Sequence, residues 1–278
     1  MIPGSPPCWP DDREELFRGA AQFYARFRPP YPQSLFDDLV RRARVGQGGV
    51  LMDIACGTGE IAIPLHARFS RVLASDIEPD MVAVGREKAA AVGASNIEWT
   101  CTRAEDVAVS EAGSIRLVSL GNAFHWVDRP LVAARALEWL EPGGFIAILG
   151  SSTPRSGSER WQAVVVDCLE HWANAVGAES PAAPGGSDAS THRATHDEVL
   201  RGAGFVGVAQ YAFPTPHTWT VDELLGFLWS TSRTVALRRH PNTARRFEAD
   251  LRERLAACEK SGRLHECVAH YYILGRRS

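Results

Sequence analysis

A carboxylate stands directly before a turn of small residues near the start of the chain. Val50–Ile54 reads as a buried strand, Ala55–Gly59 is a turn made of small residues, and Glu60–Phe69 reads as a helix. Such a turn lets the backbone approach a ligand that larger side chains would hold away. Asp53, near the strand end, is an acceptor placed to meet an amine or a hydroxyl of that ligand.

The same residues also satisfy a dinucleotide-binding pattern. Gly57-x-Gly59-x-x-Ala62 fits G-x-G-x-x-G/A, and Asp76 follows Gly57 by 19 positions, near the spacing of a ribose-binding acid. A pyrophosphate is anionic, however, and favours the N–H groups of a helix end over a neighbouring carboxylate. Asp53 therefore favours a ligand that carries an ammonium group.

The arrangement D-x-A-C-G-T-G at residues 53–59 resembles the first motif of the S-adenosylmethionine (SAM)-dependent methyltransferases with a Rossmann-like fold. The resemblance implies that SAM is the cofactor and S-adenosylhomocysteine (SAH) its product. The loop would hold the amino-acid half of SAM, and Asp76 would accept from both ribose hydroxyls. The matching positions in this core are Asp53, Ala55, Gly57, Gly59, Asp76, Ile77, Met81, Ala104, Glu105 and Asn122.

The resemblance assigns further parts of the cofactor to the remaining positions. Ile77 and Met81 would pack on the adenine, and Ala104 and Glu105 would read its edge. Asn122 would line the sulfonium end. Ala55 replaces a glycine that is frequent in the family.

An N-terminal segment resembles the opening Y-x-x-x-R-P-x-Y-P of one small-molecule subgroup. It runs from Tyr24 through Arg28 to Pro32. In that subgroup the segment caps the cofactor, which implies that Tyr24 and Arg28 lie at the site, with the arginine near the methionine carboxylate.

Strands and helices alternate after residue 50, which predicts an α/β fold with a doubly wound, mostly parallel sheet. The resemblance adds an antiparallel pair and raises the sheet to seven strands. Strands are expected at 50–54, 71–75, 97–101, 115–120, 145–149, 205–213 and 267–274. Helices are expected at 60–69, 79–91 and 130–140 in the core, and at 11–27, 33–44, 159–175, 195–202, 220–230 and 242–259 outside it.

These elements divide the chain into three parts. Residues 1–44 are expected to form N-terminal cap helices, 45–150 the SAM-binding core, and 151–278 the rest of the sheet with a substrate-binding cap. No second hydrophobic core large enough to form a separate domain is expected. The substrate is expected to meet an aromatic-rich cap made of Trp161, Trp172, Phe227 and Trp229.

Composition and sequence motifs argue against nucleic-acid-binding, membrane-spanning, secreted and metal-binding proteins. A net charge of −3, with no basic stripe carrying interleaved aromatics, argues against nucleic acid as partner. No apolar run approaches the roughly 20 residues of a membrane span, and the N-terminus lacks a signal-peptide layout. The cysteines form no C-x-x-C pair, as is usual in a cytoplasmic protein. His192 and His196 lack the glutamate of a zinc-protease motif, so no metal is expected.

The expected reaction is methyl transfer to an O or N atom of a small metabolite or natural-product intermediate. His125, in Phe124-His125-Trp126 after the fourth strand, is either a general base or an imidazole packed on Trp126. Two alternatives stay open: a non-catalytic SAM-fold accessory or regulatory protein, and a methyltransferase acting on protein or RNA. The oligomeric state is not predicted.

Overall fold

A mixed seven-stranded sheet forms the centre of the structure, a computed structural model that describes residues 17–46, 48–110, 112–177 and 194–278. In these residues the strand order is β3-β2-β1-β4-β5-β7-β6. β1 to β5 are parallel, and β7 runs antiparallel to both β5 and β6. The predicted doubly wound, mostly parallel sheet is confirmed. The strands are β1 (Val50–Ile54), β2 (Arg71–Asp76), β3 (Ile97–Cys101), β4 (Ile115–Gly121), β5 (Leu140–Ser151), β6 (Val206–Thr220) and β7 (Arg263–Arg276).

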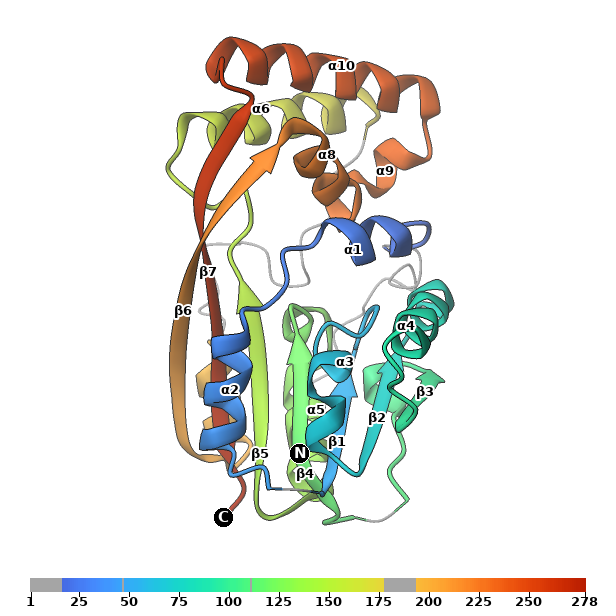
Figure 1. Cartoon of the computed structure of the whole chain (residues 1–278), viewed down its shortest axis with the longest axis vertical. Coiled ribbons are helices and arrows are strands. Elements are labelled where there is room, and N and C mark those ends of the chain that lie inside the picture. Colours follow the sequence, from blue (N-terminus) through green and yellow to red (C-terminus); the bar gives the residue numbers. More distant parts are fainter. Residues whose placement is uncertain (1–16, 47, 111, 178–193) are drawn as a thin grey trace, which may run out of the picture.

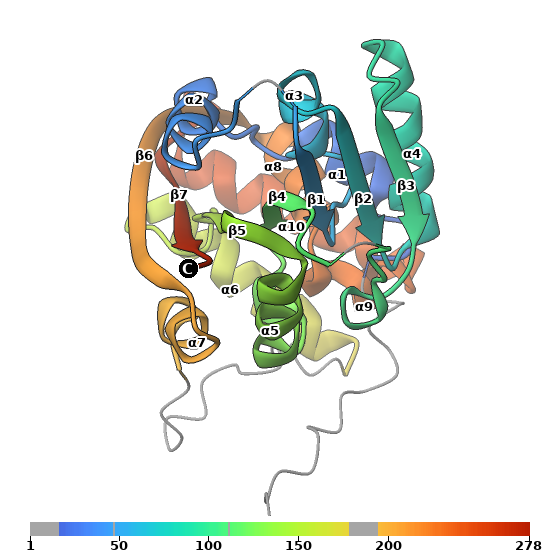
Figure 2. The ribbon, with the colours of Figure 1, turned by 90° about the horizontal axis from the view of Figure 1, so that it is seen from below.

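Helices cover both faces of the sheet (Figure 2). α2 (Gln33–Arg42), α3 (Ala62–Leu65) and α4 (Pro79–Ala91) lie on one face, and α5 (Arg129–Trp139) and α7 (His196–Gly202) on the other. Successive side chains of a strand point to opposite faces, so Leu51 joins the cluster of α2 while Met52 joins that of α5. Cutting a fully buried leucine such as Leu51 to alanine would cost about 2–5 kcal/mol.

Two helices next to the site begin with strong local signals. The Glu78 side chain accepts from the backbone N–H of Asp80 at the start of α4, where Pro79 occupies the first turn. At α5 the Asp128 side chain accepts from the N–H of Leu131. Both caps satisfy donors that a helix start leaves open. They fix where each helix begins relative to the strand before it.

A helical cap sits beyond the carboxyl ends of the parallel strands (Figure 1). It consists of α6 (Arg160–Ala175), α8 (Val221–Trp229), the short α9 (Val235–Arg238) and α10 (Pro241–Cys258). β6 and β7 were expected to be shorter. They extend out of the sheet as a two-stranded ribbon, paired as far as Thr220 and Arg263, and join the cap to the core.

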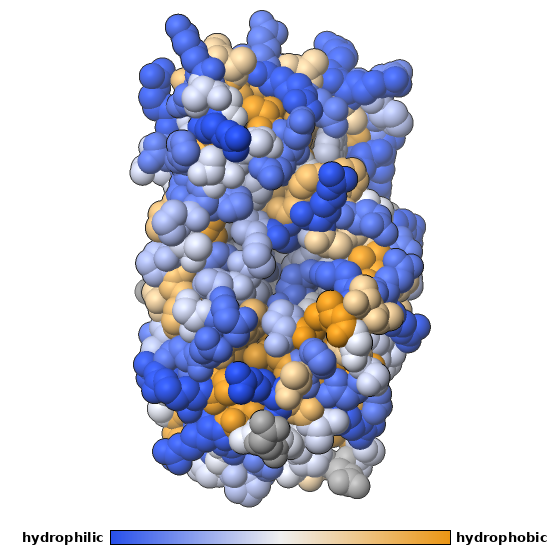
Figure 3. Space-filling view, in the orientation of Figure 1, coloured by the Kyte–Doolittle hydropathy of each residue, from blue (hydrophilic) through white to orange (hydrophobic). Residues whose placement is uncertain are grey.

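The cap has its own cluster of buried hydrophobic residues, distinct from the clusters on the two faces of the sheet. Trp161, Trp172 and Trp229 are buried in it, and their indole N–H groups donate to the carbonyl of His265 and to the carboxylates of Asp250 and Glu248. The visible surface of the cap is mostly hydrophilic (Figure 3). These tryptophans therefore stabilise the interior of the cap, whereas the sequence had suggested that they form a surface for the substrate.

The N-terminal helix is shorter than predicted. α1 spans Ala21–Phe27, and Phe17–Ala20 forms a turn in which Gly19 has a φ of 71°. The expected start at residue 11 lies outside the described residues. α1 packs on α8, where a Cβ on Gly226 would stand 2.3 Å from the Phe27 ring. This glycine lets the helix come close, and α1 lies between the cap and the sheet (Figure 1).

The predicted helix at 60–69 is also shorter. α3 begins only at Ala62, and a 3₁₀ turn at His66–Arg68 follows it. Glu60 does not extend α3 toward its N-terminus, because its side chain folds back and accepts from the backbone N–H of Thr58. Gly59, with a φ of 89°, also lies outside the right-handed helical region, so the helix can begin only after it.

Candidate active site

The turn after β1 adopts a left-handed backbone that small residues allow. Ala55, Gly57 and Gly59 have φ values of 50°, 56° and 89°. A Cβ on Gly57 would lie 3.5 Å from the ring of Tyr24. A left-handed alanine costs about 1–2 kcal/mol, and such strain is concentrated at functional sites. The surrounding structure thus holds the turn in a left-handed conformation that is unfavourable for an isolated loop.

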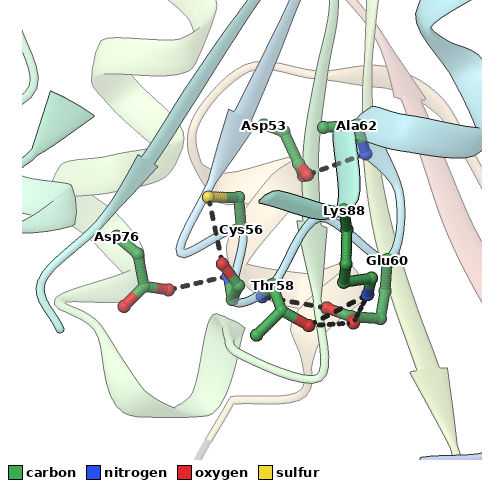
Figure 4. A network of polar contacts seen from close by, with 8 residues as sticks. Asp53, Cys56, Thr58, Glu60, Ala62, Asp76 and Lys88 are labelled. Carbon is green, nitrogen blue, oxygen red and sulfur yellow. Dashed lines mark hydrogen bonds and ion pairs between the residues drawn. The ribbon is translucent and has the colours of Figure 1, made fainter. Parts of the chain in front are cut away.

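Asp76 anchors this turn to the start of α4 (Figure 4). Its Oδ2 accepts from the N–H of Gly57 at 2.8 Å, and its Oδ1 accepts from the N–H of Glu78 at 2.9 Å. Burial raises the pKa of the carboxyl, while these backbone donors oppose the rise. Each carboxylate oxygen accepts about two hydrogen bonds. Asp76 therefore keeps room for two ligand hydroxyls, as the ribose role requires.

Asp53 is completely buried and holds the other side of the turn. Oδ1 accepts from the Ser119 hydroxyl at 2.7 Å, and Oδ2 accepts from the N–H of Ala62 at 3.1 Å. The carboxyl group thus joins β1, β4 and α3, and Figure 4 shows its bond to Ala62. A direct bond from Asp53 to a ligand amine stays a prediction; its observed role is to fix the turn.

The burial of Asp53 leads to a pH prediction. It raises the pKa of the carboxyl from 3.8 to about 7. The folded protein keeps this proton over a range in which the unfolded chain has lost it, so stability falls as pH rises from about 4 to about 7, by at most about 4 kcal/mol. The melting temperature of the wild type should therefore fall more steeply between about pH 5 and about pH 8 than that of Asp53→Asn.

Thermal melts across this pH range are the measurement. Asp37→Asn, which changes an exposed carboxylate on α2, serves as the control and should keep the wild-type slope. Parallel curves for the wild type and Asp53→Asn would show that Asp53 is ionised throughout.

A third carboxylate, that of Glu60, stabilises the turn after β1. No motif in the sequence predicted this role. Glu60 accepts from the N–H and the hydroxyl of Thr58, and Lys88 of α4 donates to Glu60 at 2.9 Å and to Thr58 at 3.1 Å (Figure 4). Lys88 is 28 positions from Glu60, so only the folded chain reveals the pair. This network fixes the turn from the side away from Asp76.

Most of the predicted cofactor residues line two adjoining pockets. The first, here the Asp76 pocket, contains Tyr24, Ala55, Gly57, Asp76, Ile77, Met81, Ala104, Glu105 and Asn122. The second, the Asp53 pocket, contains Tyr24, Arg28, Asp53, Ala55 and Asn122. Gly59 lines neither; a Cβ there would stand 2.8 Å from Ile63, so its observed role is packing. Arg103, beside the predicted Ala104, also lines the Asp76 pocket, as do Phe17, Thr102, Trp126 and Val127, which were not predicted as binding residues.

A third pocket, the cap pocket, opens between the sheet and the cap. It holds His125, which lies in the 3₁₀ turn Phe124–Trp126 and packs on Trp126 with ring centroids 5.1 Å apart. Tyr24 and Asn122 line all three pockets. The three cavities therefore meet at these two residues.

Asn122 connects the elements around this junction by hydrogen bonds. It has a φ of 52°, and its amide nitrogen donates to the Tyr31 hydroxyl at 3.0 Å and to the Ser151 hydroxyl at 3.3 Å. Its amide oxygen accepts from the N–H of Ser151. Asparagine tolerates the left-handed conformation better than most residues. Asn122 thus fixes the ends of β4 and β5 and the N-terminal segment around one point.

Arg28 joins the N-terminal segment to the cap. Its Nε donates to the Ser230 hydroxyl at 2.9 Å, and its guanidinium lies 4.6 Å from the Tyr24 ring centre and 4.8 Å from that of Phe227. Burial raises the pKa of Tyr24 to about 12, so its hydroxyl stays neutral. The two residues that the N-terminal motif singled out thus lie side by side over the glycine turn.

Comparisons with known proteins agree with this arrangement. Residues 51–144 match the family described as "Methyltransferase domain". A protein of Claviceps purpurea named "Methyltransferase" is 30% identical over 164 residues, covering 57% of this chain and 50% of that protein. The chain spans about half the length of the first curated relatives it matches.

Two solved structures share the fold. Haemonchus contortus phosphoethanolamine N-methyltransferase 2, in complex with phosphomonomethylethanolamine and SAH, has a TM-score of 0.54 at 14% identity, covering 96% of this chain and 58% of that one. The YcgJ protein of Bacillus subtilis has a TM-score of 0.54 at 13% identity, covering 88% and 99%. At these identities the likeness concerns the fold alone.

No helix within the described residues is both long and apolar enough to cross a membrane. No group of three or more His, Cys, Asp or Glu side chains in the same residues is arranged to hold a metal ion. Of the histidine pair considered in the sequence, His192 lies outside the described residues, and His196 lines the cap pocket.

Proposed function

Since residues 51–144 form a methyltransferase domain of the Rossmann-like class, we propose that this protein transfers the methyl group of SAM to an O or N atom of a small metabolite or natural-product intermediate. The observation that carries the proposal is the meeting of three pockets at Tyr24 and Asn122. Two pockets match the two halves of SAM, and the third leads to the same point from the cap.

The residues present fit SAM. Asp76 retains acceptor capacity for two ribose hydroxyls, and the apolar Ile77 and Met81 suit the adenine. The Asp53 pocket offers carboxylates for an ammonium group and Arg28 for a carboxylate, which are the two charges of an amino acid. When bound, SAM supplies an electrophilic methyl group and leaves as SAH.

The chain would act mainly by positioning and by excluding water. α1, held to α8 through Phe27 and Arg28, covers the junction of the pockets. A fixed alignment of reactants is worth effective molarities of about 10⁵–10⁸ M in well-oriented systems. Where the acceptor is a hydroxyl, His125 in the cap pocket would take its proton. An amine acceptor would need only to arrive uncharged.

The parts of the chain divide accordingly. We assign cofactor binding to residues 45–150, with the described N-terminal residues 17–44 closing over it, and acceptor binding to the cap within 151–278. A cytoplasmic location and a small molecule as the sole partner belong to the same proposal.

Transfer of a labelled methyl group from SAM to a metabolite extract tests the reaction. We expect a small molecule to gain the label, and mass spectrometry to identify it. SAM binding without transfer to any metabolite would support the alternative of a non-catalytic accessory protein. Label in protein or RNA would support the macromolecular alternative. Either result would contradict a small-molecule methyltransferase.

A further inference from the structure

The cap pocket is lined by cations and by no acid among its described residues. Its basic side chains are Arg28, Arg155 and Arg233, with His125 and His196. Arg28 already donates to Ser230. Arg155 and Arg233 are both half-buried, and within the described residues neither guanidinium makes a hydrogen bond or an ion pair. This differs from other half-buried arginines of the chain, such as Arg42 and Arg116, which meet carboxylates or carbonyls.

The two arginines are close enough to affect each other. Burial lowers the pKa of Arg155, and the charge of Arg233 lowers it further. Glu170 of α6 acts in the opposite direction, but this side chain is exposed and forms no ion pair with Arg155 among the described residues. Two like charges held together in a partly dry cavity cost free energy unless an anion joins them.

Both guanidinium groups stand on short, fixed turns rather than on free loops. Arg155 follows β5 in the turn Thr153–Ser156, closed by the bond from the N–H of Ser156 to the carbonyl of Thr153 at 2.9 Å. Arg233 lies in the 3₁₀ turn Ser232–Thr234, where the buried Thr234 hydroxyl donates to the carbonyl of Leu228 at 2.8 Å. The backbone that carries each of the two arginines is therefore fixed before any ligand arrives, which lowers the cost of ordering the site.

We propose that the methyl acceptor is an organic acid whose oxyanion, a carboxylate or a phosphate, is held between Arg155 and Arg233 in the cap pocket. The proposal rests on the transfer reaction proposed above and names its substrate class. The planar fork of arginine matches both oxyanions in bidentate geometry. The rest of the acceptor would extend toward Asn122 and Tyr24, which line the same pocket.

Thermal melts in saturating SAH test the site with matched probes: benzoate against benzamide, and phenyl phosphate against phenol. We expect benzoate, phenyl phosphate or both to raise the melting temperature more than the neutral partner does. The oxyanion with this effect shows whether the acceptor carries a carboxylate or a phosphate. Its dissociation constant should rise at least about tenfold in Arg155→Met and in Arg233→Met. Arg245→Met removes an exposed arginine of α10 outside this pocket and should leave the constant unchanged.

Calorimetric titration of SAH into each variant separates the possible failures. An unchanged SAH affinity shows that a variant is folded and keeps its cofactor site. If the wild type fails to bind SAH, the proposed function itself is wrong. If SAH binds but neither oxyanion is preferred, or if the preference persists in Arg155→Met and Arg233→Met, the acid-binding site is overturned while the transfer reaction stands.

Discussion

Asp76→Ala is expected to weaken the binding of SAH at least about 100-fold. In the proposed complex both ribose hydroxyls donate to this carboxylate, and each charge-assisted bond contributes about 1.5–3 kcal/mol. The substitution also removes the acceptor of the Gly57 N–H, which holds the glycine turn in its strained conformation. Both effects reduce affinity in the same direction, and calorimetry measures their sum.

Matched variants separate this effect from unfolding and from charge. Asp80→Ala removes an exposed carboxylate four positions away, at the start of α4, and should leave the affinity unchanged. Asp76→Asn keeps one acceptor oxygen and should lie between the wild type and Asp76→Ala. A wild-type dissociation constant in a folded Asp76→Ala protein would exclude the ribose role.

The second large effect is expected at His125. If the acceptor is a hydroxyl, His125→Ala should lower kcat by about 10²–10⁴-fold, the usual contribution of a general base. The affinity for SAH should change little, because His125 lines the cap pocket and neither of the other two. Steady-state kinetics on the identified acceptor, together with SAH titration, gives both quantities.

His171 offers a matched control for this substitution. It also packs against the next tryptophan in the chain, with ring centroids 5.3 Å apart, but lies exposed on α6. His171→Ala should retain the wild-type kcat. A wild-type kcat in His125→Ala as well would leave His125 as an imidazole packed on Trp126, the other interpretation of its sequence context.

Local sequence signals predicted the core elements well. The bounds of β1, β3 and α4 agree with expectation. β1 is a short apolar run that ends at the glycine turn, β3 alternates apolar and polar residues, and Pro79 marks the first turn of α4. The glycine turn and Asp76 were likewise readable, since closeness along the chain places both at the carboxyl edge of the sheet. Local spacing is sufficient where the site is built from consecutive βα units.

The cap and the inner contacts of the site depend on partners far apart in the chain. Ser119 meets Asp53 across 66 positions, and Arg28 meets Ser230 across 202. The partners of the cap tryptophans are also distant in the chain. The abundance of aromatic residues suggested a substrate surface, but the indole N–H groups of Trp161, Trp172 and Trp229 donate to other residues of the cap and the ribbon. Helical spacing cannot distinguish an aromatic that packs inside a cap from one that faces a ligand.

Titration of SAM, SAH and NAD into the purified wild-type protein tests the central claim most directly. The Asp76 and Asp53 pockets predict that SAM and SAH bind with dissociation constants in the micromolar range or below, and that NAD gives no heat of binding. Binding of NAD without any signal for SAM or SAH would contradict the account, because the glycine turn and Asp76 would then serve a dinucleotide.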